Sequence, residues 1–149
     1  MSAKISNEEK KAKLIEIFAK RAKNGAIPAN DSELLQPEFI ELTEDGLLTL
    51  KFPVFSWQRN GDDNLQGGMI GCMMDLTFGA FAHVIFDYGP VATISMTTNY
   101  LRQIGLSENY LITKTIFKRK GRRILYGESE AYNANNKLAV IASTNIMRL

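Results

Sequence analysis

The first part of the chain shows a helical pattern of apolar and charged residues. Ser6 and Glu9 fit the two partners of a capping box, and Asn24-Gly25 supplies a stop signal. Between them, apolar residues recur three and four positions apart with lysines on the opposite face. The recurring apolar residues are Leu14, Ile15, Phe18 and Ala22. We therefore predict a helix over residues 6–24, followed by a connection at residues 26–37.

Alternating and β-branched runs predict an antiparallel sheet. Glu44-Asp45-Gly46 is a turn signal between two short strand-like runs at residues 39–43 and 47–52. Longer runs follow, and the last three succeed one another as a meander. These longer strands are predicted at residues 91–102, 110–118, 124–132 and 138–147. The pattern predicts roughly five antiparallel strands.

The most apolar stretch, residues 69–86, lies between the hairpin and the longer strands and follows Gly67-Gly68. It is long enough to be considered as a membrane span. However, Asp75 and His83 interrupt it, and an unpaired charge in lipid costs about 3 kcal/mol or more. A helix that is apolar almost all round is typical of burial on every face. We therefore predict a buried helix at about residues 68–87.

A sheet that wraps one central helix accommodates both patterns. The predicted fold class is therefore α+β. One domain is expected over residues 1–149, in which residues 1–36 add an N-terminal helix and a connection. An open sheet leaves its second face and its edges to be covered. We therefore expect a homodimer or a dimer of dimers.

Composition agrees with this picture. The 149 residues suffice for one sizeable core, and 45% hydrophobic with 23% charged residues exclude wholesale disorder, collagen-like repeats and a disulfide scaffold. The net charge of +2 is too small to indicate nucleic acid or a membrane as the partner. Cys72 is the only cysteine, and the charged N-terminus lacks a signal-peptide pattern. We expect a cytoplasmic protein.

Asp75 is the first candidate for chemistry, because it lies inside the apolar helix. Burial removes hydration from a carboxylate and favours its protonated form. Such a residue is retained when it is paired or used, and it then serves as a general base or as a nucleophile toward an activated carbonyl. The alternative is a structural hydrogen bond, within the chain or between subunits.

Gly67-Gly68 marks the start of the same helix. Free backbone amides and the positive end of the helix dipole lie at such a start, and glycine lets a substrate carbonyl approach closely, as in an oxyanion hole. The alternative is an ordinary tight loop before a helix. An oxyanion donor there and a carboxylate about two turns along suit hydrolysis of an activated acyl group.

Several short motifs stand in a suggestive order. Asn60-Gly61 precedes Gln66-Gly67-Gly68, and the acid Asp75 follows within the helix. Three further stretches come later: the strand ending in Tyr100-Leu101-Arg102, the turn Lys120-Gly121-Arg122-Arg123, and Lys137-Leu138-Ala139-Val140. Together they resemble the hotdog-fold acyl-CoA thioesterases of the phenylacetate-type branch, over about residues 37–149. The resemblance implies a hotdog fold, a long central helix wrapped by an antiparallel sheet, here with an extra N-terminal helix.

The resemblance implies a role for each matching residue. Asp75 would be the general base or nucleophile, and the Gly67 amide, next to Gly68, would polarise the thioester carbonyl. Asn60 would orient the attacking water or the acyl group, and Thr93 matches a hydroxyl position that helps to hold the water. The family's site lies across a dimer interface, so Asp75 would face the glycine turn of the partner subunit. No cofactor is implied, because CoA is part of the substrate.

Two residues bear on the kind of activity. Gln66 stands where the family usually has His, and a glutamine exchanges hydrogen bonds but does not titrate. A second function therefore stays open, a non-catalytic acyl-CoA-binding or interaction protein on the same fold. His83, the only histidine, lacks the spacing from an acid that hotdog dehydratases need, and we expect a core or interface residue. One His and one Cys do not build a metal site.

The remaining candidates concern substrate binding. Arg122 and Arg123 belong to a basic run that is either a solvated turn or, as the resemblance implies, a contact for the CoA phosphates. Nucleic acid is a weaker third alternative. Met74 and Phe78 either belong to the core or line an acyl pocket. Cys72 is expected to be inert.

Overall fold

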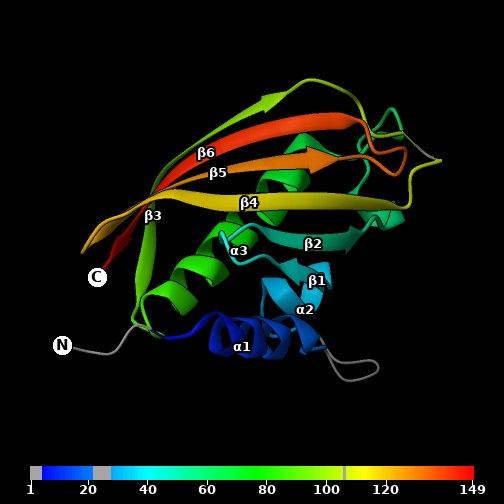
Figure 1. The fold of residues 1–149 in the computed structure, drawn as a ribbon. Coiled ribbons are helices and arrows are strands. Elements are labelled where there is room, and N and C mark those ends of the chain that lie inside the picture. Colours follow the sequence, from blue (N-terminus) through cyan, green and yellow to red (C-terminus); the bar gives the residue numbers. More distant parts are fainter. Residues whose placement is uncertain (1–4, 22–27, 106) are drawn as a thin grey trace.

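A curved six-stranded antiparallel sheet covers one long helix in the computed structural model, which describes residues 5–21, 28–105 and 107–149 (Figure 1). The strand order is β1-β2-β4-β5-β6-β3. The strands are β1 Glu38–Leu42, β2 Leu48–Pro53, β3 Val91–Tyr100, β4 Tyr110–Lys120, β5 Ile124–Tyr132 and β6 Leu138–Arg148. The helices are α1 Asn7–Ala19, α2 Asp31–Leu35, α3 Gly67–Ile85 and the short 3-10 helix η1 Ser56–Gln58. The predicted α+β architecture is confirmed.

Each of the six predicted strand-like runs forms a strand in the described residues, so the sheet has one strand more than the rough count of five. Both strands of the first hairpin join the sheet, since β2 pairs with β4 and β1 pairs with β2. The predicted meander is confirmed by the pairing of β4 with β5 and of β5 with β6. Strand β3 closes the far side by pairing with β6, which leaves β1 and β3 as the two edges.

The core lies between α3 and the concave face of the sheet. Met73, Met74 and Phe78 of α3 are 0% exposed. The Phe78 and Phe81 rings lie 6.1 and 5.3 Å from the ring of Phe117 on β4. Each such side chain contributes about 1.5–3 kcal/mol of burial free energy, so this face of α3 fixes the helix against the sheet.

Burial of α3 on every face, as the apolar run predicted, is wrong for the single chain. Gly68, Cys72 and Asp75 are exposed, and their spacing of three and four residues puts them on one line along the helix. By length and composition alone α3 passes as a membrane span, but its most apolar window is 50% buried inside the structure. The exposed line carries small or polar residues, so it differs in kind from the buried face.

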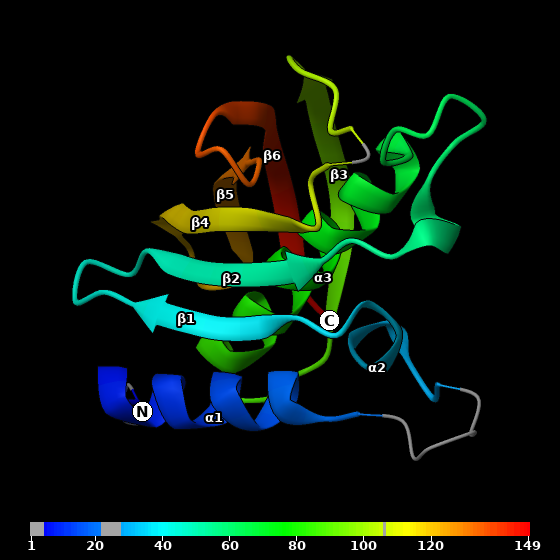
Figure 2. The same ribbon diagram turned by 90° about the vertical axis from the view of Figure 1, so that its right-hand side faces the viewer.

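The N-terminal segment packs beneath β1 and α3 (Figure 2). The capping box at the start of α1 is confirmed, because the Glu9 amide donates to the Ser6 hydroxyl at 3.2 Å and the Ser6 amide donates to the Glu9 carboxylate. Leu14 and Phe18 bury the inner face of α1. Helix α1 ends at Ala19, before the predicted residue 24, and the predicted stop at Asn24-Gly25 lies outside the described residues.

A short helix, α2, interrupts the segment that the sequence predicted as a plain connection. The Asn30 side chain caps it by accepting from the Glu33 amide at 3.0 Å, and Leu35 is buried. The five-residue helix is too short to show a helical period, which explains why the pattern missed it. It brings Ser32 next to α1, where the Ser32 hydroxyl donates to the Ile17 carbonyl at 3.3 Å.

Candidate functional site

The structure joins two of the predicted site residues, Asp75 on α3 and Thr93 on β3. The Thr93 hydroxyl donates to Asp75 Oδ1 at 2.9 Å. The register of β3 against β6 shifts between Thr93 and Ser95, and a bulge of this kind re-aims side chains beside it. Both side chains are exposed in the single chain. One oxygen of the carboxylate is therefore held by a hydroxyl, and among the described residues no hydrogen bond or ion pair holds the other.

A groove of about 610 Å³ lies beside this pair. We call it the Asp75 groove. Its floor comes from α3, one wall from the start of β3, and the other wall from α1 and the beginning of α2. Among the residues that line it are Ile17, Ser32, Leu76, Gly79, His83 and Tyr88. His83 of α3 is half-buried and lines this groove, so it is not a core residue of the single chain. The prediction of an interface residue stays a prediction.

The start of α3 is pinned to the far end of β3. The Tyr100 hydroxyl donates to the Gly67 carbonyl at 2.8 Å. A Cβ on Gly67 would meet the Tyr100 ring at 3.2 Å, so only glycine fits without a shift of the ring. The Met69 and Ile70 amides donate to the Gln66 carbonyl, which leaves the amides of Gly67 and Gly68 ahead of the helical ladder.

Gln66 and Asn60 lie in the loop before α3. Gln66 is exposed at the N-cap position, and its side chain makes no capping bond. The Asn60 side-chain oxygen accepts from the amides of Asp62 and Asn64 at 3.0 and 3.1 Å. These two hydrogen bonds hold the loop in its conformation, so only the nitrogen of the Asn60 side-chain amide is left to act on a ligand.

One chain does not bring the glycine start and the carboxylate together. Asp75 follows Gly67 by eight residues on the same helix, which separates them by about 12 Å along the axis. A thioester carbonyl group is much shorter than this distance of about 12 Å. Gly67 and Asp75 of a single chain therefore cannot act on the same carbonyl.

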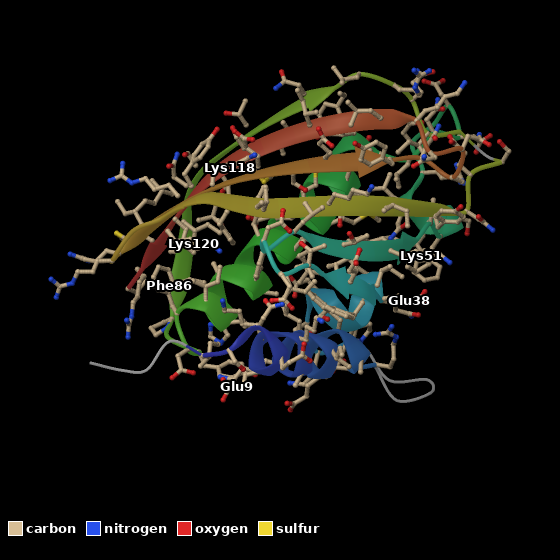
Figure 3. All side chains as sticks on the ribbon, in the orientation of Figure 1. Glu9, Glu38, Lys51, Phe86, Lys118 and Lys120 are labelled. Atoms are coloured by element: carbon tan, nitrogen blue, oxygen red, sulfur yellow. The ribbon has the colours of Figure 1, made fainter. Side chains whose placement is uncertain are left out.

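Arg122 and Arg123 lie at the turn between β4 and β5. Lys120, at the end of β4, precedes this turn (Figure 3). The Gly121 amide donates to the Ile124 carbonyl at 2.9 Å. A Cβ there would meet the same oxygen at 2.7 Å, so this tight turn requires glycine. Both arginines are exposed and line a hollow of about 620 Å³. They are available to an anionic ligand.

Met74 and Phe78, the two candidates for an acyl pocket, are core residues that do not line the Asp75 groove. Their helix contributes Leu76 and Gly79 to that groove instead. Tyr100 is a residue to which sequence reasoning assigned no role, beyond its place in a motif of the resemblance. Among the described residues, no three His, Cys, Asp or Glu side chains cluster as metal ligands would.

Comparison with known proteins gives a match in structure and none in sequence. No protein-family model matches the chain, and no curated protein matches it. A phenylacetic acid degradation-related protein from Ralstonia eutropha superposes with a TM-score of 0.75 at 20% identity, covering 91% of this chain and 98% of that one. The E. coli PaaI protein from the phenylacetic acid degradation operon gives 0.69 at 17% identity, covering 79% and 83%.

A third solved structure, a hypothetical thioesterase protein from Streptococcus pneumoniae with coenzyme A, has a TM-score of 0.66 at 19% identity and covers 76% of this chain and 85% of that one. The chain has the hotdog fold. The resemblance that the motifs indicated is confirmed at this level, since α3 is the central helix of the hotdog and the antiparallel sheet wraps it.

The hotdog sheet has one open edge next to the candidate site. Strand β3 pairs only with β6 among the described strands. Ile94 and Tyr100 on this edge are 53% and 51% exposed, and Leu101 follows at 57%. A ten-residue edge strand with exposed apolar side chains is typical of a surface that another chain covers. The same edge carries Thr93 and the Tyr100 contact to Gly67.

Proposed function

We propose that this protein hydrolyses acyl-CoA thioesters to a free acid and CoA. The observation that carries the proposal is the hydrogen bond of 2.9 Å from Thr93 to Asp75, at the side of an open groove. A carboxylate held through one oxygen presents the other in a fixed direction, as a general base or nucleophile requires. The proposal is supported by the hotdog fold, which the chain shares with a protein named as a thioesterase and solved with coenzyme A.

The proposed reaction uses Asp75 at the carbonyl carbon. As a general base, the carboxylate takes a proton from water while the water oxygen bonds to that carbon. The C–S bond then breaks, and the sulfur leaves as the thiolate of CoA, which takes up a proton. As a nucleophile, Asp75 would instead form an anhydride that water hydrolyses. In both routes Thr93 orients the carboxylate and helps to hold the water.

The oxyanion donor in this proposal comes from a second copy of the chain. Gly67 lies about 12 Å from Asp75 along α3, so the partner's Gly67 amide would polarise the carbonyl that Asp75 attacks. The exposed edge strand β3 supports such pairing, because it carries Thr93 and contacts the start of α3. A homodimer would then hold two equivalent sites.

The other predicted residues complete the proposed site. Gln66 and Asn60 of the glycine loop would orient the acyl group or the water through their side-chain amides, and Gly68 would leave room for the carbonyl. Arg122 and Arg123 would contact the CoA phosphates, for which exposed guanidinium groups are suited. No metal or further cofactor enters this reaction.

The test is a thiol-release assay on a panel of acyl-CoAs, with Asp75→Asn beside the wild type. The matched control is Glu44→Gln, which also neutralises an exposed acid, in the turn between β1 and β2. Turnover that falls with Asp75→Asn and persists in the control supports the proposal. Turnover that is equal in all three proteins contradicts it.

Gln66 favours a second candidate function, because it lacks the titratable ring that thioesterases of this branch usually carry at this position. The protein would then bind acyl-CoA without hydrolysing it. A rise in melting temperature with acyl-CoA, together with no release of thiol from any substrate, would select this alternative.

A further inference from the structure

The Asp75 groove extends well beyond the candidate catalytic pair. It follows α3 from Asp75 past Leu76 and Gly79 to His83. Eight residues of α3 separate Asp75 from His83, about 12 Å along the helix axis. Both ends of the groove therefore carry a side chain able to form hydrogen bonds. Between them, α3 presents small and apolar groups, while Lys20, Asn30, Asp31 and Ser32 bring polar groups from the N-terminal wall.

Gly79 gives the groove its width. A Cβ built on this residue meets nothing within 4 Å, so the glycine leaves open space at the floor rather than relieving a clash. Ala80 and Val91 line the same middle section. A chain of methylene groups fits beside these residues, because a methylene chain has no polar atom that needs a hydrogen-bond partner.

The far end of the groove is built by the N-terminal segment. Lys13 on α1 donates to Asp87 at 2.8 Å, and its ammonium lies 4.3 Å from the centre of the Tyr88 ring. Asp87 and Tyr88 both have positive φ angles, 53° and 62°, a conformation that costs free energy for non-glycine residues. The contacts to Lys13 help to hold this turn, so that Tyr88 stands against His83.

His83 is the polar group at this end. Its ring lies edge-on to Tyr88, with the ring centres 5.3 Å apart. Among the described residues, its imidazole nitrogens make no hydrogen bond or ion pair. Ser32 and Ile17 lie across the groove, and the Ser32 hydroxyl is already bonded to the Ile17 carbonyl. The imidazole nitrogens are thus available to a ligand that reaches the end of the groove.

We infer that this groove is an acyl subsite selective for a chain of about six carbons that ends in a hydrogen-bonding group such as a hydroxyl. The inference rests on the proposed thioester hydrolysis. Asp75 and His83 are about 12 Å apart along the helix axis. A carbonyl about 3 Å from Asp75 and a terminal group about 3 Å from His83 leave about 6 Å or slightly more of this distance for the chain between them. His83 would determine the terminal group, and Gly79 with the N-terminal wall would determine the length.

The experiment compares kcat/KM for hexanoyl-CoA and 6-hydroxyhexanoyl-CoA, two substrates that differ only in the terminal hydroxyl. The wild type is expected to prefer the hydroxylated substrate by about tenfold, the value of one hydrogen bond. His83→Leu should abolish this preference, and His83→Gln, which restores a donor and an acceptor, should recover most of it. A wild type without the preference, or a His83→Leu variant that keeps it, overturns the inference.

Gly79→Leu tests the length of the groove independently. Leucine is a good helix former and projects into the groove, so the variant should fold and lose both six-carbon substrates by at least about tenfold while still hydrolysing acetyl-CoA. Ala12→Leu, which adds a leucine at an exposed position of α1 outside the groove, is the matched control. Equal loss of acetyl-CoA and hexanoyl-CoA turnover in Gly79→Leu contradicts the subsite.

The outcomes separate this inference from the proposed function. If the wild type hydrolyses no acyl-CoA, the proposed function fails and the acyl subsite fails with it. If the wild type hydrolyses several acyl-CoAs but neither His83 nor Gly79 affects their relative rates, the thioesterase stands and only the subsite is wrong.

Discussion

The two faces of α3 carry different residues and meet different surroundings. The face toward the sheet is made of large apolar side chains, among them Met73, Phe78 and Phe81, which are buried. The opposite face carries Gly68, Cys72 and Asp75, which are exposed. A single apolar run in the sequence therefore contains one face that holds the fold and one that is left for a ligand or a partner chain.

The difference shows that residue size sets the role of each face of this helix. Large side chains fill the space under the curved sheet, where each buried methylene adds free energy. Small side chains leave the backbone of the other face accessible, and a carboxylate there interrupts no core packing. Substitutions on the buried face should therefore change stability, and substitutions on the exposed face should change activity.

The largest expected effect is on the buried face. Phe78→Ala removes a ring that is 0% exposed and packs near Phe117, so the free energy of unfolding should fall by about 3–5 kcal/mol. Cys72→Ala, on the exposed face, should change it by no more than about 0.5 kcal/mol. Urea denaturation of both variants measures this contrast, which disappears if the two variants unfold alike.

On the exposed face, Asp75→Asn should lower the turnover of acyl-CoA by about a hundredfold or more, because an amide does not accept a proton as a general base does. The same variant should keep the free energy of unfolding within about 0.5 kcal/mol of the wild type, since Asp75 is exposed. Thiol release and urea denaturation are measured on one preparation. A large fall in the free energy of unfolding would instead show that Asp75 stabilises the fold.

A smaller loss of activity is expected for Thr93→Val. Valine keeps the shape of threonine but removes the hydroxyl that donates to Asp75, so turnover should fall by about tenfold. Thr97→Val makes the same change at another exposed position of β3 and should leave turnover within about twofold. If Thr93→Val retains full activity, the hydrogen bond does not orient the carboxylate.

The smallest expected effect concerns the contact between α1 and the loop that follows α3. The hydrogen bond from Lys13 lowers the pKa of Asp87 below its usual value. A lowered folded-state pKa stabilises the protein above the unfolded pKa of about 4, and this stabilisation is lost as the pH falls through the folded value. The melting temperature of Asp87→Asn should therefore lie slightly below that of the wild type at pH 7. The melting temperatures of the two proteins should converge below pH 4. A constant difference between them across this range would exclude the ion pair as the cause of the difference.

Local sequence patterns predicted most of the secondary structure. The capping box at Ser6 and the turn at Gly46 depend on neighbouring residues, so a few consecutive positions are enough to predict them. Helix α2 was missed because its five residues carry too little periodicity. The sequence also predicted Asp75 and Gly67 as candidates with their roles, whereas Thr93 and its role came from the resemblance.

The amino-acid sequence by itself determined the succession of elements apart from the short helices, and the one acid inside the apolar helix, because periodicity, caps and turns depend on residues close together along the chain. The tertiary structure decided which face of α3 is exposed, which hydroxyl meets Asp75, and that His83 shares a groove with it. These facts join residues of different elements. They follow from how the sheet curves over the helix and how α1 packs beside it, and no local pattern records that packing.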